Sequence, residues 1–401
     1  MTVQSIQENA TSSCLITSSF NASDLTDAVK ACREKLNGKP DLAVVFVSSD
    51  YRPHLKELIE ILQIDGHTTK IIGASADGLY GVTTEHENAS GVSMLFLKLP
   101  QTVIHPQNGS HNHAVHFPDR AIAKMDAPPA GWIILGNPLQ TDLSSQLREL
   151  NSHFPTIPVI GGLVRGGPEN DDLFLFTEDG ICREDFLSVR FHGGLKIHPL
   201  ISQGCRPIGD PLVVTGASHN QIISIGRKEA LKVLEETFDT LPNHERRKAQ
   251  GNVFAGLAAT ENVDNFETGH FVIRHIVGAD LAEGRLMLDS PARVGQTLQF
   301  QIRESEGASQ DLRSACQQSV DSGVDPFGAM IFGGHGRGRC LFEIENHDAG
   351  LFHELFGEVP LTGMFANGEI GPIAGRNFRH DHSFCAALFL NPDQDISPDS
   401  P

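Results

Sequence analysis

The sequence has 401 residues, of which 39% are hydrophobic and 20% charged, a composition typical of a globular protein with two or three domains. Asp and Glu number 50 against 31 Lys and Arg, so the formal net charge is −19. A field of this sign repels nucleic acid and anionic lipid, and we expect neither a nucleic-acid partner nor a membrane partner.

Seven cysteines are scattered along the chain, and no two stand at a CxxC spacing. An odd number without such spacing indicates reduced thiols rather than a disulfide framework or a zinc ribbon. Residues 1–19 carry no basic region and no long apolar core, and no apolar run has transmembrane length. We therefore expect a soluble protein of the cytoplasm.

Helix and strand patterns alternate in the first half of the chain. The buried-strand pattern LAVVFV at 42–47 is followed by a helix and a second strand, which predicts a parallel βαβ unit. A second such unit follows, and because each ends in a glycine-rich turn we expect a loose internal repeat. The expected helices are 22–36, 53–63 and 142–152, and the expected strands are 42–47, 70–74, 90–99, 132–135, 157–160, 173–176, 186–191 and 212–215.

Strand patterns outnumber helix patterns in the second half. A helix pattern at 227–241 ends at Pro242, which cannot continue a helix. The other expected helices are 307–319 and 348–356, and the expected strands are 253–258, 271–277, 285–288, 328–332, 362–366 and 384–390. Residues 392–401 are acidic and rich in Pro and Ser, which predicts a disordered tail.

These elements predict a mixed α/β (α+β) fold of two domains, with β-sheets packed in layers and flanked by helices. Several expected strands are apolar on both faces, as in sheets that are covered on both sides. The expected division is an N-terminal segment and helix at 1–37, a first domain at 38–221, a second domain at 222–391 and the tail at 392–401. Ligand pockets favour the junction of two such domains.

The stretch 360–375 presents a single carboxylate, Glu369, among glycines. Asn367 and Gly368 precede it, and Pro372 is expected to end the strand ladder just after it. A strand that runs into a tight turn and presents one Glu is typical of a small-ligand site. The alternative is a hairpin in which Glu369 caps a neighbouring backbone amide.

The segment 333–339, GGHGRGR, follows an apolar strand and contains a GxGxG pattern. The residues after it do not begin a helix pattern, and a dinucleotide fingerprint needs a helix N-terminus to receive the pyrophosphate. We therefore expect no nucleotide site here. Arg337 can pair a ligand carboxylate through two hydrogen bonds, with His335 beside it. The alternative is a solvated turn whose arginine pairs a surface acid.

Two groups of histidines suggest a metal. The first lies in an expected loop at 100–129 and consists of His105, His111, His113 and His116. A solvated polar segment explains this group without a metal, because the loop offers no rigid frame. The second group, His380 and His382, lies close in sequence to Glu369, and the three side chains can in principle form a site. We assign no metal ligand and no cofactor from either group.

Ser75 and Asp77 stand in a glycine-punctuated turn at the end of the strand at 70–74. The pattern is not GxSxG, because its fifth position is Asp. An Asx turn or an ST turn is the common role of such residues beside Gly. An exposed Ser75 at a strand end nevertheless leaves an enzyme open.

Taken together, the motifs resemble those of the FIST family. The run Asn367-Gly-Glu-Ile-Gly-Pro372 and the turn Gly336-Arg-Gly338 are similar to signature motifs of the FIST C-terminal domain. The runs Ile72-Gly-Ala-Ser-Ala-Asp-Gly78 and Ile160-Gly-Gly162 resemble the glycine turns of the FIST N-terminal domain. The resemblance covers nearly the whole chain. It departs from the family pattern before the Gly336 turn, where relatives often have a Cys and this chain has Gly-Gly-His, so a thiol-based role is in doubt there.

The resemblance implies an intracellular sensory module for signal transduction that binds a small ligand, such as an amino acid or a related metabolite, and acts through a signalling partner. Arg337 and Glu369 offer the opposite charges that suit a zwitterion. The expected ligand-binding residues are Glu369, Asn367, Gly368, Arg337, His335, Ser75 and Asp77. One alternative is a metal-dependent or hydrolase-like enzyme with Glu369 as acid–base. Another is a protein-recognition scaffold. The absence of Walker, Rossmann and triad patterns favours binding over catalysis.

Overall fold

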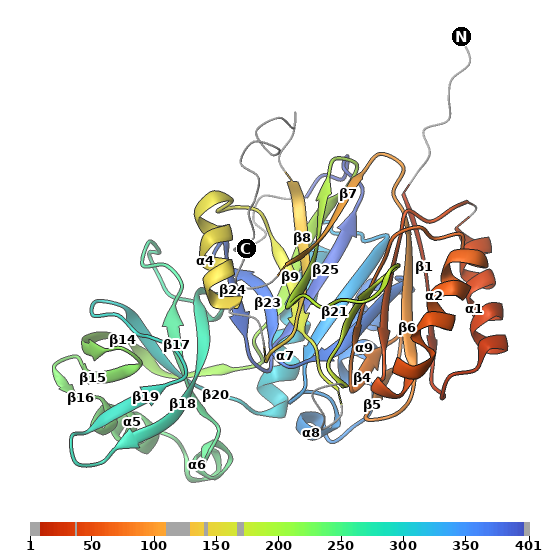
Figure 1. Cartoon of the computed structure of the whole chain (residues 1–401). Coiled ribbons are helices and arrows are strands. Elements are labelled where there is room, and N and C mark those ends of the chain that lie inside the picture. Colours follow the sequence, from red (N-terminus) through yellow and green to blue (C-terminus); the bar gives the residue numbers. More distant parts are fainter. Residues whose placement is uncertain (1–8, 37, 110–128, 140–142, 167–171, 397–401) are drawn as a thin grey trace.

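The computed structural model describes residues 9–36, 38–109, 129–139, 143–166 and 172–396. The remaining positions, which include His111, His113, His116 and the end of the expected tail, lie outside the described residues. A mixed α/β fold with several β-sheets flanked by helices is confirmed (Figure 1). Within the described ranges, no helix is both long and apolar enough to cross a membrane.

Three six-stranded sheets form the body of the molecule. The first has the order β1 (Ala10–Ile16), β6 (Val92–Lys98), β2 (Leu42–Val47), β3 (Ile71–Ser75), β10 (Leu175–Thr177) and β11 (Gly180–Ile181). The second has the order β7 (Val103–Gly109), β12 (Phe186–His192), β8 (Pro129–Gly136), β9 (Val159–Leu163), β23 (Glu369–Ile373) and β24 (Arg376–His380). The third has the order β13 (Lys196–Ser202), β25 (Phe384–Leu390), β21 (Gly328–Gly334), β22 (Leu361–Ala366), β4 (Gly78–Tyr80) and β5 (Glu85–Glu87).

The three sheets share one topology. In each, the third and fourth strands are parallel, and every other pairing is antiparallel. The expected internal repeat therefore has three copies rather than two. Sequence reasoning missed the third because a long insertion separates β13 from β21.

Each copy gives its hairpin to another copy. The hairpin β4–β5 follows β3 in the chain but pairs with β22, while β10–β11 follows β9 but pairs with β3. The hairpin β23–β24 follows β22 and completes the exchange by pairing with β9. As a result, the three sheets cannot separate without breaking backbone hydrogen bonds.

Helices cover the outer faces of the three sheets. These helices are α1 (Ala22–Lys35), α2 (Leu55–Ile64), α4 (Leu143–His153), α7 (Ser305–Asp321) and α9 (His347–Phe356). Along β2, Val44 and Phe46 enter a core shared by all three sheets, whereas Val45 and Val47 pack under α1 and α2. This alternation is why the strands are apolar on both faces.

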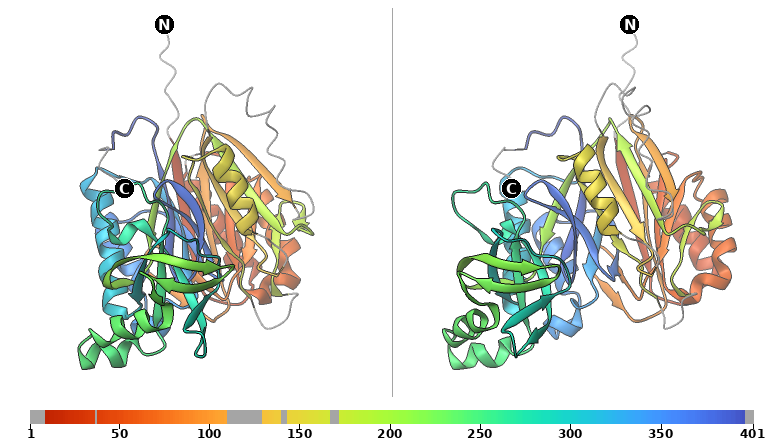
Figure 2. Two further views of the ribbon diagram at one scale, coloured as in Figure 1. Left: turned by 90° about the vertical axis from the view of Figure 1, so that its left-hand side faces the viewer. Right: turned by 60° about the vertical axis from the view of Figure 1, so that its left-hand side comes forward.

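The insertion between β13 and α7 forms a separate seven-stranded sheet, seen on the left in Figure 1 and from two further directions in Figure 2. Its strands are β14 (Arg206–Ser218), β20 (Thr297–Ile302), β17 (Val253–Ala258), β18 (Phe271–Asp280), β19 (Arg285–Leu288), β15 (Gln221–Ile225) and β16 (Lys228–Glu229), accompanied by α5 (Ala230–Asp239) and α6 (Asn243–Ala249). β14 also pairs with β15, so this sheet closes on itself.

Three expectations about local structure are wrong, and the start of a fourth element, the helix α2, is shifted. A one-turn helix, α8 (Arg339–Phe342), follows the GGHGRGR segment, where we expected none. His105 lies on strand β7 rather than in a loop. Pro372 lies inside β23 rather than ending it. The proline is tolerated because the pairing of β23 with β9 stops at Ile370, so its missing N–H leaves no hydrogen bond to β9 unmade. The helix expected from residue 53 starts with a 3-10 turn, η1 (Ser49–His54).

The expected domain boundary after residue 221 lies inside β15, and strand pairing crosses it. β13 lies before this boundary and pairs along its whole length with β25 near the C-terminus. Glycine turns that are far apart in the sequence therefore come together in space.

Candidate functional site

The turns that follow β3, β9 and β22 meet at one place. The Arg165 guanidinium donates to Asp77 over 2.8 Å, and both side chains are partly exposed. The Asn367 backbone N–H donates to the Leu163 carbonyl and the Leu163 backbone N–H donates to the Gly368 carbonyl, both over 2.9 Å. The fold thus brings together Asp77, Asn367 and Gly368 from the predicted set. It adds Arg165 from the segment after β9, which sequence reasoning missed.

Glu369 lies beneath these turns and has no exposed surface. Its Oε2 atom accepts the Ser383 backbone N–H over 2.7 Å, which is the capping role considered from the sequence. Its Oε1 atom is also buried and has no hydrogen-bond partner among the described residues. Burial raises the pKa of this carboxyl well above its usual range, aided by Asp381 and opposed by the Ser383 amide and by Arg337.

Arg337 is also completely buried, and it pairs an internal acid rather than a surface acid. Its Nε and Nη2 atoms donate to the two carboxylate oxygens of Asp348 over 2.6 and 2.9 Å. Phe342 lies under the guanidinium, with its ring centre 5.3 Å away. Burial lowers the pKa of Arg337, but the charge and hydrogen bonds of Asp348 outweigh it and keep the net pKa above its ordinary value.

The two hydrogen bonds that we expected Arg337 to donate to a ligand carboxylate are therefore donated to Asp348. One donor atom remains, because Nη1 is buried and has no partner among the described residues. This atom approaches Gly204, where a Cβ would lie 2.8 Å from it. Arg337 is also near enough to Glu369 to lower the pKa of that carboxyl. The pair thus presents one free cationic donor and one free carboxyl oxygen.

Tyr80 adds a third buried polar atom. Its hydroxyl has no partner among the described residues, and its ring stacks on Phe365 at a centroid distance of 4.7 Å. A Cβ on Gly333 would lie 2.0 Å from this hydroxyl, so only glycine fits at the end of β21. Burial, followed by the nearby Glu85, raises the pKa of Tyr80 well above its usual range. Sequence reasoning missed this residue.

His335 is exposed and lies above this buried group. Its ring contacts His382 at a centroid distance of 5.2 Å, and His382 contacts His275 at the same distance. Burial, followed by Arg303, lowers the pKa of His382 to about 4, so its ring is neutral at physiological pH. Arg303 donates to the Gly336 carbonyl over 2.6 Å and so ties the inserted sheet to the glycine turn.

Ser75 and the GGHGRGR segment, which the sequence singled out, have structural roles. Ser75 is buried, and its Oγ accepts the Phe174 N–H over 3.0 Å, which anchors the segment leading into β10. The N-terminus of α8 accommodates Glu87, whose Oε1 accepts the Arg339 N–H over 3.0 Å. A Cβ on Gly338 would collide with this carboxylate. The position where a pyrophosphate would bind in a nucleotide loop is thus filled by a side chain of the protein itself.

The His380, His382 and Glu369 group does not gather as a metal site among the described residues. His380 faces Glu369 across the β23–β24 ladder, but its Nε2 atom lies 3.0 Å from the Gly371 carbonyl. Burial lowers the pKa of His380 to about 4. A different cluster in the described part of the chain, made of His275, Asp289 and Asp381, has the spacing of metal ligands.

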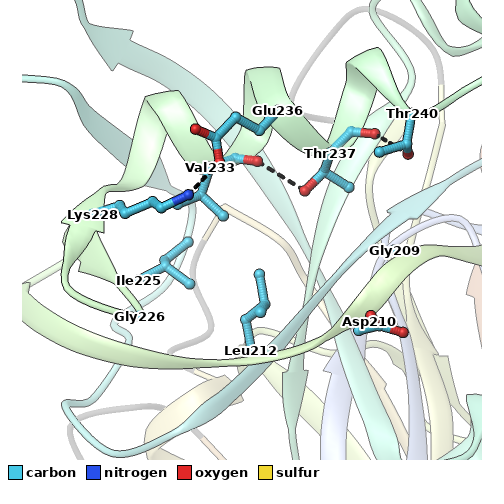
Figure 3. A pocket seen from close by; sticks show the side chains of 10 residues that line it. All are labelled: Gly209, Asp210, Leu212, Ile225, Gly226, Lys228, Val233, Glu236, Thr237 and Thr240. Carbon is cyan, nitrogen blue, oxygen red and sulfur yellow. Dashed lines mark hydrogen bonds and ion pairs between the residues drawn. The ribbon is translucent and has the colours of Figure 1, made fainter.

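A surface cavity of about 340 Å³ lies elsewhere, between α5 and β14 in the inserted sheet (Figure 3). Leu212, Ile225 and Val233 form its apolar wall, and an exposed ion pair between Lys228 and Glu236, 2.8 Å long, lies at its edge. None of the predicted binding residues lines it. We consider the buried group around Glu369 the better candidate, because unpaired polar atoms are concentrated there.

Comparison with known proteins confirms the resemblance seen in the motifs. The FIST N domain model matches residues 41–228 and the FIST C domain model matches residues 230–372. The uncharacterized protein Rv0628c of Mycobacterium tuberculosis (strain ATCC 25618 / H37Rv) is 31% identical over 91% of this chain and 95% of its own length. The uncharacterized protein Mb0898c of Mycobacterium bovis (strain ATCC BAA-935 / AF2122/97) is 36% identical over 65% of this chain and 67% of its own length. The chain therefore belongs to the FIST family, and it carries the FIST N and FIST C domains one after the other.

Proposed function

We propose that this protein is a sensory module of a signal-transduction system and that it binds a small ligand at the buried group formed by Glu369, Arg337 and Tyr80. FIST domains are associated with sensory signal transduction and with small-ligand binding. The observation that carries the proposal is the pair of atoms Glu369 Oε1 and Arg337 Nη1, which are fully buried and find no partner in the part of the chain that the structure describes. Each such atom costs about 1–3 kcal/mol when it is left unsatisfied, and a ligand that pairs with both recovers this cost.

The ligand class that fits is a small amino acid or a related metabolite. Arg337 Nη1 suits a ligand carboxylate, while Glu369 Oε1 suits an ammonium group. With no ligand charge beside it, burial raises the pKa of Glu369 well above its usual range and so disfavours the ionised form. An incoming ammonium group favours the ionised form, so we expect binding to release a proton and to tighten as the pH rises.

The signal would arise from the glycine turn at 333–338. Because Glu369 and Arg337 have no exposed surface, a ligand reaches them only after a local opening, which we assign to this turn. His335 is exposed on this turn, and Arg165 and Asp77 are partly exposed, so a partner protein can detect such a movement there. The output is then a change of shape that a signalling partner reads.

A thermal-shift screen of amino acids and small carboxylates at pH 7 tests the proposal. Binding to the native state at a ligand concentration 100 times Kd stabilises a protein by about 2.7 kcal/mol, which is several degrees in Tm. We expect the hit to lose its effect in Glu369→Gln, which keeps the shape of the side chain and removes the charge.

The matched control is Glu354→Gln, because it makes the same change of side chain at a glutamate that is exposed on α9 and paired with Arg313. This variant should respond to the ligand as the wild type does. The proposal fails if no compound in the screen raises Tm, or if Glu369→Gln keeps the full shift.

A further inference from the structure

We propose that His275, Asp289 and Asp381 form a binding site for one divalent transition-metal ion, such as Zn²⁺, at the junction between the inserted sheet and the three-sheet body. One ligand atom from each side chain lies within 4.8 Å of the other two. His275 comes from β18, Asp289 follows β19, and Asp381 lies in the turn between β24 and β25. The three ligands thus come from parts of the chain that meet only in the folded protein.

The ligand types select the ion. One imidazole nitrogen and two carboxylate oxygens suit Zn²⁺, Mn²⁺ and Fe²⁺ better than Ca²⁺, which binds through oxygen alone, or Cu⁺, which prefers sulfur. Ligand atoms around tetrahedral Zn²⁺ lie about 3.4 Å apart, given bonds of about 2.1 Å. Binding would draw these ligand atoms, which lie within 4.8 Å of one another, closer together. Three protein ligands leave the fourth position open for water or a ligand group.

Neighbouring groups already hold two of the three ligands in place. The Asp289 Oδ2 atom accepts the His275 backbone N–H over 3.3 Å, and the Asp289 N–H donates to the His275 carbonyl over 3.1 Å. The Phe254 ring packs edge-on against the His275 ring, with centroids 4.9 Å apart. Support of this kind orients metal ligands and tunes their affinity.

The charges around the cluster permit a cation. Arg379 donates to Asp381 Oδ1 over 3.0 Å, which leaves the second oxygen of that carboxylate for coordination. Arg274 also lies near both aspartates, and its Nη1 atom donates to the Arg379 carbonyl over 3.0 Å. These two arginines balance the negative charge of the two carboxylates. A bound ion takes over part of that role.

The site also adjoins the candidate ligand group without belonging to it. The His275 ring contacts His382, and His382 contacts His335 on the glycine turn. An ion fixed by Asp381 therefore restrains the turn 381–383, whose Ser383 amide holds Glu369. The metal site does not depend on the proposed small molecule, because among the described residues none of the three metal-binding side chains forms a hydrogen bond with Glu369 or Arg337.

The test uses untagged, full-length protein that has been stripped with a chelator and titrated with Zn²⁺ by calorimetry. We expect one Zn²⁺ per chain and at least a tenfold weaker Kd in Asp289→Asn and in Asp381→Asn. Asp239→Asn is the matched control. Asp239 is an exposed aspartate that forms a 3.3 Å ion pair with Arg246 and is not part of the cluster. This variant should bind Zn²⁺ as the wild type does.

Two further measurements separate this site from other histidines. The visible spectrum of the Co²⁺-loaded protein should lose its ligand-field bands in His275→Ala. The double variant His111→Ala/His113→Ala should keep full Zn²⁺ binding. The proposal is overturned if the wild type takes up no Zn²⁺, if the two aspartate variants bind as tightly as the wild type, or if only the His111/His113 variant loses the ion.

Discussion

The ion pair between Arg337 and Asp348 offers the sharpest test of the energetics inside this fold. Both side chains are fully buried, and the guanidinium donates two hydrogen bonds of 2.6 and 2.9 Å to the carboxylate. Asp348→Asn keeps the size of the side chain but leaves the Arg337 charge without a counter-charge in the core. Breaking a buried pair in this way costs about 3–5 kcal/mol, so we expect the free energy of unfolding to fall by this amount.

The same helix provides a matched control. Glu354 also lies on α9 and accepts two hydrogen bonds from one arginine, Arg313, over 2.8 and 2.9 Å. This pair differs mainly in exposure, since its side chains are 48% and 58% exposed whereas both members of the Arg337 pair are at 0%. Water screens an exposed pair, so Glu354→Gln should destabilise the protein far less than Asp348→Asn does.

Urea unfolding followed by far-UV circular dichroism measures both variants under one condition. The double variant Arg337→Met/Asp348→Leu should recover most of the loss, because it removes both charges and leaves an apolar contact of similar size. If Asp348→Asn and Glu354→Gln destabilise the protein equally, burial does not set the strength of these pairs and the reasoning is refuted.

Two more predictions concern residues beside this pair. Burial, followed by the charge of Asp348, raises the pKa of Glu85 from 4.5 to about 8, so the folded state holds this proton more tightly than the unfolded state. The free energy of unfolding should therefore fall by a few kcal/mol as the pH rises from about 4.5 to about 8. Urea unfolding across this pH range should show a flatter decline in Glu85→Gln. A Glu85→Gln variant whose stability falls with pH as steeply as that of the wild type would contradict this prediction. Gly333→Ala places a Cβ against the Tyr80 hydroxyl and should lower the free energy of unfolding by about 1–3 kcal/mol or more. The double variant that also carries Tyr80→Phe should recover part of this loss. If urea unfolding shows no destabilisation in Gly333→Ala, the close packing at this position is contradicted.

The local elements of the fold follow from the sequence because their causes are local. The continuous apolar run at 42–47 is buried along its whole length as β2, and the helix pattern at 348–356 is α9. Two of the glycine turns were correctly placed at the ends of β3 and β9, where a parallel strand must turn. Motif spacing sufficed to identify the family, since the glycines and Glu369 stand at fixed positions along short segments.

The structure around α8 shows why a local pattern can mislead. No helix period follows Gly338, yet one helical turn forms because Glu87, distant in the sequence, accepts the Arg339 N–H and satisfies the helix N-terminus. The same contact blocks the place where a phosphate would bind. The expectation of no nucleotide loop rested on the missing helix pattern, whereas the structure has a helical turn whose N-terminus already holds Glu87.

The partners of Arg337 and Glu369 could not be predicted from the sequence, because they depend on burial and on contacts between distant segments. The sequence alone determined the βαβ units, the glycine turns, the family and the presence of one carboxylate and one guanidinium in the C-terminal motifs. The tertiary structure decided that Asp348 pairs with Arg337 and that the Ser383 N–H donates to one oxygen of Glu369. It also decided that Arg165 and Tyr80 belong to the candidate site. The physical reason is the exchange of hairpins among the three sheets, which places strand ends from remote parts of the chain around one point.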